Sequence, residues 1–185
     1  LNSAFTKLIE RHEVLSTNVI ETGNTPKVII RDRSAFEVSR MAVSSDTDEI
    51  REVITHEQSV PFDLANDPLM RALLVETGAE SAILVITIHH IISDAWSNRI
   101  LINELVQRYK SEVLGTELVL PALQYSYKDF AYSQQHWSDN DSLADQRQFW
   151  HDTLALPLTT LELPTANSRP AIQTFNGGEV RYAFS

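Results

Sequence analysis

The chain has no cysteine, and it has only five glycines among its 185 residues. Without cysteine it can form no disulfide, thiolate metal site or cysteine nucleophile, although its redox compartment stays open. The glycines are too scattered for a P-loop, a dinucleotide-binding fingerprint or the G-x-S-x-G turn of hydrolases. No apolar run approaches the roughly 18 residues of a membrane-spanning helix. These absences argue against the nucleotide-binding, hydrolase and membrane-spanning classes.

Basic residues are in the minority, with 15 Lys and Arg against 25 Asp and Glu and a formal net charge of −10. Phosphate backbones and anionic lipid headgroups repel an acidic chain, so we expect no nucleic acid and no membrane as partner. The start at Leu1 lacks the charged-then-apolar pattern of a signal peptide, which favours a cytoplasmic protein. With 43% hydrophobic residues, the chain can bury one sizeable core.

The most informative stretch of the sequence runs from Ser81 to Trp96. Its apolar part, Ile83 to Ile88, predicts a strand buried on both faces, and this strand stops on His89 and His90. Successive strand side chains point to opposite faces, so we expect His90 to face an open cleft and His89 to point into the protein. Asp94 follows His90 by four residues, close enough for the loop to bring a carboxylate behind the imidazole.

This cluster has several chemical interpretations. Histidine exchanges a proton near neutral pH, which suits a general base, although a histidine that ends a strand is more often structural. Asp94 could orient an imidazole, pair with a cation or cap the helix that follows. A zinc site is disfavoured because adjacent strand histidines diverge and the chain has no H-E-x-x-H. We therefore predict no metal.

The hydrophobic patterns along the rest of the chain predict an α/β sandwich. Apolar residues at helical spacing indicate helices over residues 1–12, 46–58, 94–114, 127–137 and 142–154. Strand patterns cover residues 14–21, 27–31, 69–76, 83–88 and 179–184. The first helix has no N-cap and the last strand reaches the final residues, so we expect a chain truncated at both ends.

Five short segments, in order along the chain, resemble conserved motifs of one family. H-H-I-I-S-D-A at 89–95 resembles the H-H-x-x-x-D-G motif of the chloramphenicol-acetyltransferase-like superfamily. The others resemble the condensation domains of nonribosomal peptide synthetases: R-H-E-V-L-S-T at 11–17, P-F-D-L at 61–64 with P-L-M-R at 68–71, Y-K-D-F-A at 127–131, and F-W at 149–150 followed by Leu154 and Pro157.

The resemblance implies a fold and an activity for residues 1–185. The fold would be the N-terminal lobe of a condensation domain, a two-layer sandwich of a mixed β-sheet flanked by α-helices, with the C-terminal lobe absent. The activity would be acyl transfer that forms an amide between a carrier-bound thioester donor and an amine acceptor. No cofactor would be bound directly, since substrates ride on phosphopantetheine arms of upstream and downstream carrier protein domains. Residues 1–185 alone should be inactive.

The resemblance also implies residue roles. His90 matches the residue assigned to catalysis, and His89 matches its mainly structural partner in the catalytic motif. Asp94 matches an aspartate that forms an ion pair with Arg11. Ala95 stands where the family has a glycine whose backbone amide lies near the reacting carbonyl. If that position needs φ > 0, Ala costs on the order of 1 kcal/mol. As a first-turn helical residue Ala would be tolerated, although its methyl group narrows the pocket.

Two further departures from the family pattern keep other functions open. Ser16 replaces the second arginine of the early motif, and Ser133 replaces the tryptophan that follows Y-x-D-F-A-x. One alternative is a relative that acylates alcohols, as in ester or wax-ester synthesis. Another is a degenerate domain that only recruits partners, and a third is an epimerising or ester-forming relative with the same histidine motif.

Overall fold

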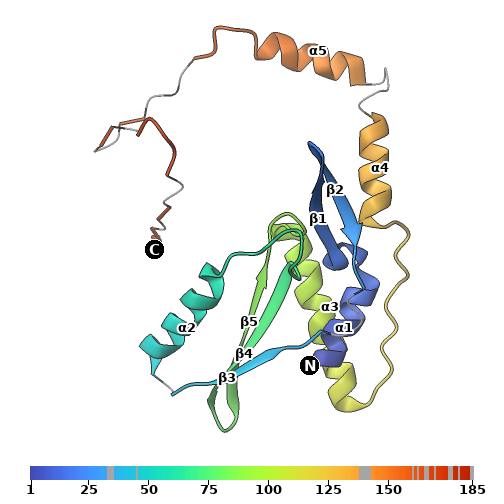
Figure 1. Cartoon of the computed structure of the whole chain (residues 1–185), viewed down its shortest axis with the longest axis vertical. Helices are drawn as coiled ribbons and strands as arrows, with labels where there is room; N and C mark the ends of the chain where they lie inside the picture. The colour runs from blue at the N-terminus through green and yellow to red at the C-terminus, as the bar shows by residue number, and fades with distance from the viewer. Residues whose placement is uncertain are drawn as a thin grey trace. The chain divides into compact units, whose positions relative to one another are not determined.

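The computed structural model describes residues 1–32, 36–44, 46–137, 143–159, 161, 163–164, 167–168, 170–174, 177–178 and 180–183 (Figure 1). It divides into two compact units, Leu1–Asp139 and Asn140–Ser185. Within the residues described, no helix has both the length and the apolar character needed to span a membrane.

The first unit contains all the strands that the structure describes. Its elements, in order, are α1 Asn2–Arg11, η1 Glu13–Ser16, β1 Thr17–Thr22, β2 Thr25–Ile30, β3 Ser39–Ala42, α2 Thr47–Ser59, β4 Met70–Gly78, β5 Ser81–Ile88, α3 Ala95–Leu114 and α4 Tyr127–Trp137. The second unit contains α5, Ala144–Thr153. Ser142, where we placed the start of this last helix, lies outside the described residues.

A mixed three-stranded sheet in the order β3-β4-β5 forms the centre of the first unit. β3 runs parallel to β4, and β5 returns antiparallel with Ile88 opposite Met70. β1 and β2 form a separate antiparallel hairpin in which Thr22 pairs with Thr25 across a two-residue loop. Gly23 in that loop has φ +64°, a left-handed conformation that glycine adopts without steric cost.

Helices cover both faces of the three-stranded sheet, as expected for a mixed sheet flanked by helices (Figure 1). On one face, α1 and α3 lie side by side and bury Phe5, Leu8, Leu101 and Leu105 against alternate residues of β4 and β5. On the other face, α2 packs Val53 and Ile54 onto the intervening strand residues Leu73, Val75 and Val85. Strand alternation therefore divides the apolar residues of β4 between two clusters.

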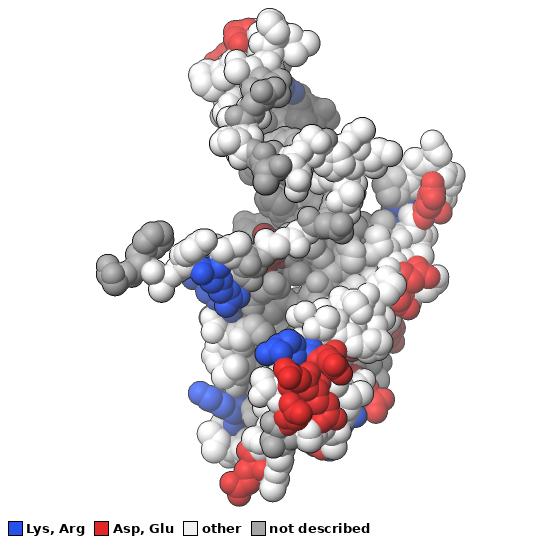
Figure 2. Space-filling model, turned by 90° about the vertical axis from the view of Figure 1, so that its left-hand side faces the viewer, with Lys and Arg blue, Asp and Glu red and all other residues white. Residues whose placement is uncertain are grey.

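The α2 side of the first unit is charged at its surface. Figure 2 shows acidic side chains grouped beside basic ones on this face. α2 begins with Asp46 as its N-cap, whose side chain accepts a hydrogen bond from the backbone N–H of Asp48. Asp48 in turn forms an exposed ion pair with Arg51 at 2.6 Å. The helix predicted over residues 46–58 thus begins within one residue of the observed start.

The structure differs from the sequence predictions at three strands. The strand expected from residue 14 begins at Thr17, because Glu13–Ser16 forms a 3-10 turn. The edge strand β3 was not predicted, since its four residues are all exposed and show no apolar alternation. The strand expected over 179–184 is absent from the described residues 180–183, while Glu179 and Phe184 lie outside them. The described part of the second unit holds no strand with which this segment could pair.

Candidate active site

The two histidines occupy a tight turn at the end of β5. The backbone N–H of His89 still donates to the carbonyl of Leu69, the residue before β4, at 2.9 Å, so pairing between the two segments continues one residue past the strands. Ile92 N–H then donates to the His89 carbonyl at 3.1 Å, and the Ser93 hydroxyl approaches the same carbonyl at 3.4 Å. His89 is half-buried and His90 is exposed, in agreement with the alternation predicted at this strand end.

The ring of His89 is oriented from two sides. Its Nδ1 accepts a hydrogen bond from the Ile91 backbone N–H at 3.0 Å. The ring also makes an edge-to-face contact with Phe62, with centroids 5.8 Å apart and planes at 85°. Because Nδ1 is the acceptor, a neutral His89 carries its proton on Nε2. These two contacts hold the His89 ring in place.

Asp94 is the N-cap of α3. Its Oδ1 accepts hydrogen bonds from the Ser97 backbone N–H at 2.7 Å and from the Ser97 hydroxyl at 2.8 Å. The Ser97 hydroxyl oxygen accepts from the Asp94 backbone N–H at 2.7 Å, which completes a capping box. Gly115 closes the other end of this helix in a left-handed conformation with φ 62°. The capping interpretation of Asp94 is the one that the structure supports.

We expect the cap at Asp94 to weaken in acid. Hydrogen bonds from the backbone N–H of Ser97, and then from its hydroxyl, hold the pKa of Asp94 below its ordinary value. A carboxyl whose pKa is lower in the folded than in the unfolded chain stabilises the fold above about pH 4 and loses that effect as pH falls through the folded pKa. Asp94→Asn keeps a cap acceptor but does not titrate.

The test is the melting temperature of the wild type and of Asp94→Asn as a function of pH. The melting temperature of the wild type should exceed that of Asp94→Asn by a margin that becomes smaller as pH falls below about 4. In a Ser97→Ala background, which lacks the hydroxyl donor, the same comparison should depend less on pH. An advantage that stays constant across this range would mean that the Asp94 carboxylate does not act through the cap.

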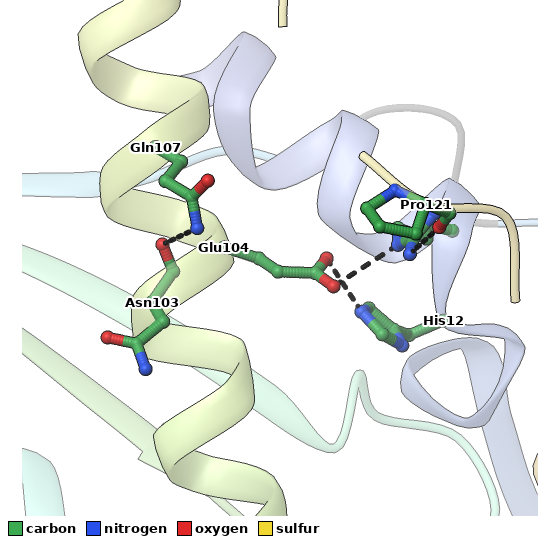
Figure 3. A network of polar contacts seen from close by, with 6 residues as sticks. His12, Asn103, Glu104, Gln107 and Pro121 are labelled. Carbon is green, nitrogen blue, oxygen red and sulfur yellow. Dashed lines mark hydrogen bonds and ion pairs between the residues drawn. The ribbon is translucent and has the colours of Figure 1, made fainter. Parts of the chain in front are cut away.

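The ion pair expected between Arg11 and Asp94 is not among those of the described residues. Arg11 instead contacts Glu104, with Nε 3.2 Å from Oε1, and donates from Nη2 to the Pro121 carbonyl at 2.5 Å (Figure 3). The expectation was wrong because the Arg11 and Asp94 side chains each contact other groups that lie closer. Asp94 is engaged by Ser97 three residues on, and Arg11 ends a helix that packs against α3.

Glu104 is a site residue that the sequence did not suggest. It is only 9% exposed, and its second oxygen lies 2.9 Å from Nε2 of His12 (Figure 3). One buried carboxylate on α3 thus contacts both the last residue of α1 and the residue that follows it. A signal was present, since Glu104 lies within the buried stripe that includes Leu101 and Leu105, where a lone charge needs a partner.

Ala95 is the first residue of α3 and has helical backbone geometry. A residue in that conformation needs no positive φ, so the alanine is accommodated without strain. We expect Ala95→Gly to lower the free energy of unfolding by no more than about 1 kcal/mol, through the greater backbone freedom of glycine in the unfolded chain. Urea denaturation would measure this change, and a variant more stable than the wild type would contradict the account.

Two contacts join segments that are far apart in the sequence. Lys128 of α4 lies 3.5 Å from Glu13, which directly follows the two residues that contact Glu104. Phe62 reaches His89 from the loop after α2. Ser16 is buried at the end of η1 and Ser133 is half-buried on α4, so both replacements sit in packed surroundings.

The family comparison covers the whole chain. The sequence model of the Condensation domain family matches residues 1–185, and the chain therefore belongs to this family. Malpinin synthetase of Mortierella alpina is 33% identical over 187 residues, covering 100% of this chain and 2% of the synthetase. Tyrocidine synthase 2 of Brevibacillus parabrevis is 35% identical over 180 residues, covering 97% of this chain and 5% of the synthetase.

Solved structures confirm the fold. The epimerization domain from the third module of tyrocidine synthetase B is 27% identical with a TM-score of 0.77, covering 90% of this chain and 38% of that one. The X-domain from teicoplanin biosynthesis is 27% identical with a TM-score of 0.79, covering 92% and 38%. The chain thus spans well under half of these structures and a few per cent of the curated relatives.

Proposed function

We propose that this chain is the N-terminal lobe of a condensation domain that forms amide bonds in nonribosomal peptide synthesis. The observation that carries the proposal is the exposed His90, presented by a turn at the end of β5 in a chain matched to the family from end to end. Its neighbour His89 is held by Phe62 and by a backbone N–H, which leaves His90 free of that structural task.

In the proposed reaction an amine attacks the carbonyl carbon of a thioester. The carbon–nitrogen bond forms, the carbon–sulfur bond breaks, and pantetheine leaves as a thiolate that takes up the proton lost by the amine. The amine must lose a proton, and His90 accepts it, or holds the amine and stabilises the charge that develops. Asp94 and Glu104 take no direct part in this step. Asp94 caps α3, the helix that follows the turn, and Glu104 connects α3 to the end of α1.

The partners follow from this chemistry. Donor and acceptor would each arrive on the phosphopantetheine arm of a carrier protein domain, one upstream and one downstream. A C-terminal condensation lobe would form the second wall of the site, excluding water and holding the two arms in line. The proposed protein works in the cytoplasm, where its carriers are made.

Competition between acceptors tests the proposal. The complete condensation domain would receive a loaded donor carrier and acceptor carriers bearing either an amino acid or its hydroxy analogue. The proposal predicts amide as the main product. Ester as the main product would indicate the alcohol-acylating relative, and inversion of the α-carbon without transfer would indicate an epimerising one. Carrier binding without either reaction would indicate a recruitment module, which the Ala95, Ser16 and Ser133 replacements favour.

A further inference from the structure

We infer that Phe62 and Arg71 are positioning residues for the histidine turn. Arg71 holds the Phe62 ring against His89, and His89 in turn orients the backbone that presents His90. The inference rests on the proposed function, because the orientation of His90 affects a rate only if His90 takes part in the reaction. It gives the P-F-D-L and P-L-M-R segments a shared role.

Arg71 is locked in place by four contacts. Its Nε lies 3.1 Å from Oε1 of Glu57. Its Nη2 donates to the carbonyls of Glu57 at 3.2 Å and of Val60 at 2.9 Å. Its guanidinium carbon lies 3.9 Å from the centroid of the Phe62 ring. A guanidinium stacks on an aromatic face and donates in its own plane at the same time, which lysine cannot do.

The environment of Arg71 favours this arrangement. The two carbonyls belong to the C-terminal end of α2 and the residue after it, where the helix dipole attracts a cation. The Arg71 and Glu57 side chains are only 26% and 20% exposed, so solvent screens the pair less than it would a surface pair. The arginine therefore joins α2 to β4 and covers one face of Phe62.

Phe62 connects Arg71 to the histidine turn, because its ring contacts both Arg71 and His89. Its ring meets the His89 ring edge to face at 5.8 Å. The Nδ1 of His89 accepts from the Ile91 N–H at 3.0 Å, and its backbone N–H donates to Leu69 at 2.9 Å. His90 is the single residue between the two that the Nδ1 bond joins. A rotation of the His89 ring would therefore break the contact that sets the backbone on both sides of His90.

Phe62 could orient His89, or it could simply fill space in the core. Only the first role requires an aromatic ring, so a substitution that removes the ring separates the two. Phe62→Leu retains apolar bulk but removes both the guanidinium stack and the edge-to-face contact. Phe36→Leu is the matched control, because Phe36 is also half-buried against the same core cluster. The Phe36 ring stacks on Phe5 at 4.8 Å instead of on a histidine.

The experiment uses the complete condensation domain. Phe62→Leu should lower kcat for amide formation about 10-fold with KM for the donor carrier unchanged, the scale of a misplaced catalytic group. Phe36→Leu should lose comparable thermal stability but keep kcat, and Phe62→Tyr should restore the rate. In spectra of the domain labelled with ¹³C-histidine, the His89 signal, assigned with His89→Gln, should shift in Phe62→Leu and in Arg71→Met but not in Phe36→Leu.

Two results would overturn the inference. One is an equal kcat for Phe62→Leu and Phe36→Leu, and the other is a His89 signal that neither Phe62→Leu nor Arg71→Met moves. If Phe62→Leu does not fold, Arg71→Met and Arg71→Lys provide the same comparison, with exposed Arg40→Met as control. A wild-type domain that forms no amide would refute the proposed function, while the histidine spectra would still decide whether Phe62 orients His89.

Discussion

Replacing His90 with alanine should reduce amide formation by the complete condensation domain about 100-fold or more, the scale of a lost general base. The side chain is exposed at the turn after β5, so its removal leaves no cavity and no unpaired buried group. The melting temperature should therefore stay close to that of the wild type. Single-turnover kinetics with loaded donor and acceptor carriers would measure the loss in rate.

His136→Ala is the matched control for this experiment. His136 is also exposed, on α4, where its Nδ1 lies 2.8 Å from the Tyr132 carbonyl. Its replacement should leave the rate unchanged. If His90→Ala turned over at a rate near that of the wild type, no essential base could be assigned to this position.

Removal of the Glu104 carboxylate should cause the largest loss of stability among the variants considered. Glu104→Ala leaves Arg11 and His12 without their shared partner in a nearly buried site, since their side chains are only 17% and 15% exposed. Breaking a buried pair on one side costs about 3–5 kcal/mol, and we expect the lower end because Arg11 keeps the Pro121 carbonyl. Urea denaturation monitored by circular dichroism would measure it.

Glu112→Ala is the control on the same two helices. Glu112 also lies on α3 and contacts Lys7 of α1, but the lysine side chain of this pair is 53% exposed. Glu112→Ala should therefore lower the free energy of unfolding much less than Glu104→Ala, as for other solvent-exposed pairs. A double-mutant cycle should show coupling between Arg11 and Glu104 but additive effects for Arg11 and Asp94. Equal losses for Glu104→Ala and Glu112→Ala would contradict the buried network.

Local patterns predicted the elements that position the histidines. The apolar run before His89 became β5, and Gly115 ends α3 as a C′ glycine should. β5 is less buried than predicted, because Val85 is its one buried residue and Ile83 is 38% exposed. Such features depend on a few neighbouring residues, so a single sequence contains the information. β3 was missed because all four of its residues are exposed at the sheet edge, where no core selects an apolar alternation.

The polar contacts were harder to predict because they depend on distant parts of the chain. Arg11 and Glu104 are 93 residues apart, and only the packing of α1 on α3 brings them together. Asp94 had a partner three residues away in Ser97, and that local cap replaced the long-range pair suggested by the resemblance. The link from Arg71 through Phe62 to His89 likewise joins three segments, so only the folded structure displays it.

The intact mass of the acceptor carrier after one turnover tests the central claim most directly. With the complete wild-type domain, the acceptor arm should gain the mass of the donor acyl group. Hydroxylamine added afterwards cleaves the thioester that holds the product to the arm but leaves the new amide intact, so the released hydroxamate should contain the donor acyl group joined to the acceptor residue. The account predicts this mass gain for the wild type and its loss in His90→Ala. An acceptor carrier of unchanged mass, or a mass gain equal in both proteins, would contradict it.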